Sequence, residues 1–193
     1  MVKTNPVDGW FAKARLATEN KQNDQVLGFY QKAYEADPKD YGANTQLASI
    51  YIREKKYDLA EKHAKNAVAI KPTSAGGYAQ LATIYANQKR WAELNAILTE
   101  SEKRVPSNLS PFYAAGNVLL ALGENFPTAE QYFKKYMKQE PEARAPKHAH
   151  ARWRLGLLYE KQNKKAEART EISAAVRDLP DFEPAKKDLA RLK

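Results

Sequence analysis

Three similar five-residue stretches decide the fold of this chain: LASIY at residues 47–51, LATIY at 81–85 and LGLLY at 155–159. The first two begin 34 residues apart. In each stretch a leucine comes first, a small residue second and a tyrosine last. Because the same pattern returns at a fixed spacing, internal repetition is the strongest signal in the sequence.

Prolines mark the same period. A proline cannot continue a helix, because it lacks an N–H group and its ring clashes with the preceding turn. The first three intervals between five regularly placed prolines are 34, 34 and 35 residues, and the last interval is 39 residues. The prolines are Pro38, Pro72, Pro106, Pro141 and Pro180. They predict five units, at about residues 7–40, 41–74, 75–108, 109–143 and 149–182.

Each unit is predicted to contain two amphipathic helices. In the second unit, apolar residues at helical spacing predict helices over about 41–54 and 57–70. When each proline is set at position 32 of its unit, position 8 is always alanine or glycine. Small residues there allow the two helices to approach closely. Residues 183–193 are predicted to form a final helix that covers the last unit with an apolar side and turns a charged side to water.

These columns resemble the tetratricopeptide repeat family, which has Leu-Gly or Leu-Ala at positions 7–8, Tyr at 11, Ala at 20 and 27, and Pro at 32. The resemblance covers residues 7–180. It implies an all-α fold, in which a right-handed superhelical solenoid of five helix–turn–helix repeats is closed by a C-terminal capping helix, as a single domain over residues 1–193. It also implies a non-enzymatic scaffold that binds a peptide or protein segment in its concave groove.

Charge is distributed unevenly along the 193 residues. The formal net charge is +9, and residues 134–193 carry 16 Lys and Arg against 9 Asp and Glu, a surplus of 7. A basic surface attracts acidic partners. We therefore expect a protein or peptide partner with acidic character at the C-terminal end of the groove. The chain has no cysteine, so disulfides and thiolate chemistry are excluded.

No constellation of residues predicts catalysis, a metal site or a cofactor. Of the three histidines, His63 lies beside charged residues and is interpreted as solvated or partly packed. His148 and His150 are two residues apart, so on a helix they point to different faces and make a poor metal pair. The sequence therefore predicts that the protein is not an enzyme.

The resemblance also implies which side chains face a partner, because the first helix of each repeat lines the concave groove of this family. Tyr113 and Trp153 either bind there or pack between repeats. Aromatic and arginine side chains are common at the energetic centres of protein interfaces. The predicted partner-binding residues are Phe11, Arg15, Ser49, Arg53, Thr83, Asn87, Tyr113, Asn117, Trp153, Arg154, Leu157 and Lys161.

Two other functions stay open at this point. Repeat stacks can self-associate through exposed terminal faces, which predicts a homo-oligomer. A basic nucleic-acid adaptor is disfavoured, because lysines alternate with acidic residues and no nucleic-acid motif is present. The sequence predicts a soluble protein without a transmembrane segment, in either the cytoplasm or the periplasm, and its alanine-rich repeats suggest a bacterial source.

Overall fold

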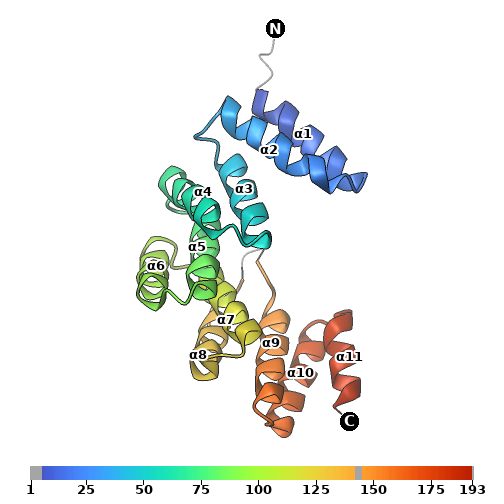
Figure 1. The fold of residues 1–193 in the computed structure, drawn as a ribbon. Coiled ribbons are helices and arrows are strands. Elements are labelled where there is room, and N and C mark those ends of the chain that lie inside the picture. Colours follow the sequence, from blue (N-terminus) through green and yellow to red (C-terminus); the bar gives the residue numbers. More distant parts are fainter. Residues whose placement is uncertain (1–5, 142–144, 193) are drawn as a thin grey trace. The chain divides into compact units, whose positions relative to one another are not determined.

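The structure is a computed structural model that describes residues 6–141 and 145–192. Over these residues it contains eleven α-helices and no strand (Figure 1). The all-helical fold class is confirmed. In chain order the helices are α1 (Pro6–Glu19), α2 (Asn23–Ala36), α3 (Tyr41–Arg53), α4 (Tyr57–Ile70), α5 (Ala75–Asn87), α6 (Trp91–Arg104), α7 (Ser110–Leu122), α8 (Phe126–Tyr136), α9 (His148–Lys161), α10 (Lys165–Asp178) and α11 (Glu183–Arg191).

The turn inside each helix pair has a recurrent backbone. In the second pair, the Lys56 amide donates to the Tyr51 carbonyl and the Lys55 amide donates to the Ile52 carbonyl. These are the two hydrogen bonds of a Schellman motif, which ends a helix with a residue in the left-handed conformation. That residue stands at position 15 of every unit: Lys21, Lys55, Lys89, Gly123 and Asn163, with φ of 58°, 57°, 57°, 72° and 60°.

Small residues at position 8 bring the helices of a pair together, as the sequence predicts. Ala14, Ala48 and Ala82 are completely buried. In α7 the same position is Gly116, where a Cβ atom would lie 2.9 Å from a ring carbon of Phe133. The Phe133 ring therefore fills the space that a side chain would need, and the glycine permits the close approach of α7 and α8.

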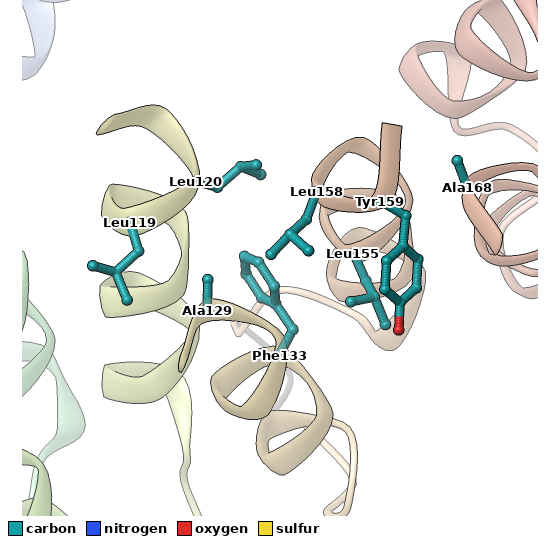
Figure 2. Packing of buried hydrophobic residues seen from close by; sticks show 8 residues of the cluster. All are labelled: Leu119, Leu120, Ala129, Phe133, Leu155, Leu158, Tyr159 and Ala168. Atoms are coloured by element: carbon teal, nitrogen blue, oxygen red, sulfur yellow. The ribbon is translucent and has the colours of Figure 1, made fainter. Parts of the chain in front are cut away.

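Packing divides the chain into two compact units, Met1–Ile84 and Tyr85–Lys193, and each is described here by itself. In the second unit, one apolar cluster joins four consecutive helices (Figure 2). Phe133 of α8 lies between side chains of α7 and α9 in this cluster. The members are Leu119, Leu120, Ala129, Phe133, Leu155, Leu158, Tyr159 and Ala168.

In the first unit, His63 departs from the prediction. It was expected to be solvated or partly packed, but only 5% of it is exposed. Its ring is stacked on Tyr51 and meets the edge of Tyr34, with ring centroids 5.8 Å and 4.8 Å away. Its Nδ1 lies 3.1 Å from Oδ1 of the fully buried Asn44. The charged neighbours in sequence hid this burial, because they lie on other faces of α4.

Helix α11 packs its apolar side against the fifth helix pair. Ala185 is completely buried, and Leu189 and Leu192 pack on the same cluster as Ile172 and Ala175 of α10. No helix among residues 6–141 and 145–192 is long and apolar enough to cross a membrane.

Candidate functional site

One face of α1 forms an open pocket of about 590 Å³. Residues three or four apart on a helix share a face, so the lining residues follow directly from the helical period. Tyr30 of α2 closes the other side of the pocket. The α1 residues that line it are Asp8, Phe11, Ala12, Arg15, Thr18 and Glu19. Two of them, Phe11 and Arg15, belong to the partner-binding set predicted from the sequence.

Phe11 and Tyr30 make the apolar wall of this pocket. Their ring centroids are 5.3 Å apart and the rings meet edge to face at 75°. A Cβ atom on Gly42 of α3 would lie 2.9 Å from the tip of the Phe11 ring, so Phe11 also packs closely on α3. Burial raises the pKa of the Tyr30 hydroxyl, and the nearby positive charge of Arg53 acts in the opposite direction. Both rings are half-buried, which leaves part of each available for contact.

A second pocket of about 330 Å³ lies next to the first, because Thr18 lines both. It lies between α1, α2 and α3, and its floor is apolar. Its lining residues are Thr18, Asn23, Val26, Leu27, Ile50, Arg53 and Glu54. The structure thus brings three predicted residues, Phe11, Arg15 and Arg53, to one surface. We call the residues that line these two pockets the α1–α3 surface.

Two other predicted residues of the first unit bond within the fold. Gln80 of α5 donates to the Ser49 hydroxyl and to the Thr45 carbonyl, both at 2.8 Å. Ser49 therefore helps to join α5 to α3, although its side chain stays exposed. The Thr83 hydroxyl donates to the Ala79 carbonyl one turn earlier, at 2.8 Å.

In the second unit, the predicted residues of α7 are partly committed to packing. The Tyr113 ring lies 5.1 Å from that of Tyr136 and 5.9 Å from that of Phe133. Asn117 is half-buried, and its Oδ1 has no hydrogen-bond partner among the described residues. Asn87 and Leu157 are half-buried and Lys161 is exposed.

Trp153 packs against α11, and Arg154 packs against Trp153. The Trp153 indole N–H donates to Asp188 at 2.8 Å, and its ring meets Phe182 edge to face at 5.2 Å. The Arg154 guanidinium lies 4.4 Å from the centre of the Trp153 ring. Arg191 forms ion pairs with Glu160 and Asp188 in the same region. These contacts hold Trp153 within the fold, and the Arg154 Nε atom is buried without a hydrogen-bond partner among the described residues.

Sequence reasoning missed Tyr30, the residue that completes the α1–α3 surface. It lies on a second helix, whereas the prediction drew only on first helices. A signal was present, because Tyr30 falls at position 24 of its unit, where the resembling family has an aromatic residue. Among the described residues no group of three or more His, Cys, Asp or Glu could hold a metal ion.

The paired helices and the recurrent Schellman turns define a helical-repeat protein. The comparisons with known proteins give the family. Two models of the tetratricopeptide repeat match the chain, one over residues 41–74 and one over residues 113–181. The chain belongs to the tetratricopeptide repeat family.

Individual relatives are distant. Protein bimA of Emericella nidulans is 36% identical over 56 residues, a match that spans 29% of this chain and 7% of bimA. Among solved structures, the tetratricopeptide repeat protein TTC0263 of Thermus thermophilus has a TM-score of 0.73 and 20% identity, over 96% of this chain and 98% of that one. Yeast Tom70 has a TM-score of 0.78 and 17% identity, over 97% of this chain but 39% of Tom70. These similarities establish the fold.

Proposed function

We propose that this protein binds a short segment of a partner protein on the α1–α3 surface. A fold of this class is a protein-interaction scaffold in general, because stacked helix pairs expose a long row of first-helix side chains. The finer proposal is that a large apolar side chain of the partner enters the pocket between Phe11 and Tyr30. A polar contact with Arg15 or Glu19 then fixes the segment.

The observation that carries this proposal is the pocket itself. It is built from residues on one face of α1, it is open to solvent, and two half-buried aromatic rings form its wall. Aromatic side chains that are partly buried and rigidly held supply large contact areas at low entropic cost. Arg15 is 81% exposed and pairs only loosely with Glu19, at 3.8 Å, so it can turn to a ligand.

Peptide selection tests the proposal. A random peptide library is displayed on phage and selected on the whole protein, and the affinities of the selected peptides are measured by fluorescence anisotropy. Ala12 is exposed and lines the pocket, so Ala12→Gln fills space there without removing a core contact. We expect Ala12→Gln and Phe11→Ala each to weaken binding by about tenfold or more, in line with the loss of an anchoring contact.

The matched control is Leu59→Ala, because Leu59 is a large apolar side chain on α4 that is 44% exposed and lies outside both pockets. It should leave the affinities unchanged. Circular dichroism should give the same helix content for all variants. If the selected peptides bind Ala12→Gln and Phe11→Ala as tightly as the original protein, the α1–α3 surface is not the binding site.

An acidic partner at the C-terminal end stays a prediction, as does self-association. The basic side chains there have internal acidic partners in part: Arg152 pairs with Glu171 and Asp178, and Arg191 with Glu160 and Asp188. This internal pairing reduces the positive charge that a partner would meet, which is why the proposal favours the first unit.

A further inference from the structure

The charged side chains that line the α1–α3 surface differ in whether they have a partner, and this difference bears on what binds there. Arg15 pairs with Glu19 at 3.8 Å, and Glu54 pairs with Lys56 at 2.7 Å. Arg53 makes no ion pair and no side-chain hydrogen bond with any residue in 6–141 or 145–192. It is the one cation lining the two pockets that has no such partner within the described residues.

Arg53 lies at the end of the surface that a ligand would reach after filling the aromatic pocket. It lines the second pocket, which adjoins the first at Thr18. Val26 and Ile50 line the same pocket as Arg53, and Tyr30 of the aromatic wall packs against the apolar cluster that contains both of them. The opposite end of the first pocket is formed by Asp8, a carboxylate that also has no ion pair among the described residues and would repel an acidic group.

The distance between the two features sets a spacing on the ligand. Phe11 and Thr18 are seven residues apart in α1. At 1.5 Å per residue this is about 10 Å along the helix axis. An extended peptide covers about 10 Å in three residues, at 3.3 Å per residue. A side chain three residues from the one in the pocket would therefore lie near Thr18, at the pocket that Arg53 also lines.

We infer that the partner segment is acidic at this position: it carries a large apolar side chain for the pocket between Phe11 and Tyr30 and, about three residues away, a carboxylate that pairs with Arg53. An arginine suits this role, because its guanidinium donates two parallel hydrogen bonds to one carboxylate. The inference rests on the proposed function, since it names the chemistry of the ligand for that same surface. A competing role for Arg53 needs no ligand, because a cation in the last turn of a helix such as α3 is stabilised by the helix dipole.

Three synthetic peptides that differ at one residue separate these roles: GAAFAAEG, GAAFAAQG and GAAFAAKG, each labelled with fluorescein. Their affinities are measured by anisotropy at low ionic strength, where exposed charge pairs are least screened. We expect the original protein to bind the glutamate peptide tightest and the lysine peptide weakest, with about a fivefold to tenfold range, as for a solvent-exposed ion pair and its repulsive counterpart. In Arg53→Glu the order should reverse.

The control with the same change of charge is Lys39→Glu, because Lys39 is exposed in the turn before α3 and lines neither pocket. It should keep the original order of peptide affinities.

If all three peptides bind equally and Ala12→Gln weakens all of them, the proposed function stands and the acidic preference is wrong. If the order fails to reverse in Arg53→Glu, or if none of the peptides binds at 1 mM peptide (about the weakest affinity such an assay resolves), the inference is overturned. The library selection with Phe11→Ala then decides the proposed function independently.

Discussion

At the scale of single residues, the buried histidine His63 joins the first two helix pairs, because its ring contacts Tyr34 of α2 and Asn44 of α3. Asn44 donates through Nδ2 to the carbonyls of Pro38 and Asp40, at 2.9 Å each, so its Oδ1 is left as an acceptor. Nδ1 of His63 must therefore carry the proton that it donates to Asn44. Asn66 donates to the same oxygen at 3.2 Å. The neutral imidazole is thus held in one tautomer between two tyrosine rings.

This geometry predicts a dependence of stability on pH. Burial, together with the charge of Lys62, lowers the pKa of His63 below its usual value. The unfolded chain then binds the proton more readily than the folded chain does. The stability that His63 contributes is fully present above about pH 6.5 and is lost as the pH falls, by up to about 1.4 kcal/mol for each pH unit. Urea unfolding at pH 7.5 and pH 5.0 measures the change.

His63→Gln keeps a hydrogen-bond donor for Asn44 and removes the titrating group. The free energy of unfolding of this variant should therefore differ much less between pH 7.5 and pH 5.0. The control is His148→Gln, because His148 is a half-buried histidine in the second unit. This variant should keep the difference in the free energy of unfolding between pH 7.5 and pH 5.0. If the stability of His63→Gln depends on pH as strongly as that of the original protein, His63 is not the group that causes the loss of stability at low pH.

At the scale of helices, the turn within each pair explains how 34 residues fold back on themselves. Each first helix ends on a residue with positive φ, and in three of the five turns that residue is a lysine. A side chain costs about 1–2 kcal/mol in this conformation, whereas glycine adopts it freely. The Schellman hydrogen bonds compensate for that cost.

Glycine at such a turn should therefore stabilise the protein. We expect Lys55→Gly to raise the free energy of unfolding by about 0.5–1 kcal/mol, which is less than the full strain because glycine also makes the unfolded chain more flexible. Lys62→Gly, the same substitution inside α4, should lower it by about 1 kcal/mol. Both are measured by urea unfolding at pH 7.5. A loss of stability in Lys55→Gly would show that the lysine side chain contributes more than the strain removes.

The sequence predicts the helices better than the site, for a physical reason. The helix pairs follow from proline spacing and small residues, which act locally, so helices predicted at 41–54 and 57–70 are found at Tyr41–Arg53 and Tyr57–Ile70. The site depends on contacts between helices, both within the first pair and between α1, α2 and α3. Tyr30 completes the first pocket from the second helix of the same pair, at a position that the prediction did not consider, although position 24 of the repeat signals an aromatic residue. Asp188 of α11 accepts a hydrogen bond from Trp153, and this contact comes from a helix outside the repeat.

At the scale of the whole molecule, the predicted partner-binding residues do not behave as one set. In the unit Met1–Ile84, Phe11, Arg15 and Arg53 lie on one pocketed surface. In the unit Tyr85–Lys193, Tyr113, Trp153 and Arg154 are engaged by aromatic rings or by α11. The central claim is therefore that recognition is concentrated in the first unit.

Mapping a bound peptide by nuclear magnetic resonance tests that claim most directly. The tightest peptide from the library is added to the whole, ¹⁵N-labelled protein, and changes in amide chemical shift are followed through the titration. We predict that the largest changes fall on residues 8–19 and around Tyr30 and Arg53, and that residues of α9 to α11 change little. Changes centred on Trp153 and Arg154, with α1 unaffected, would contradict the account.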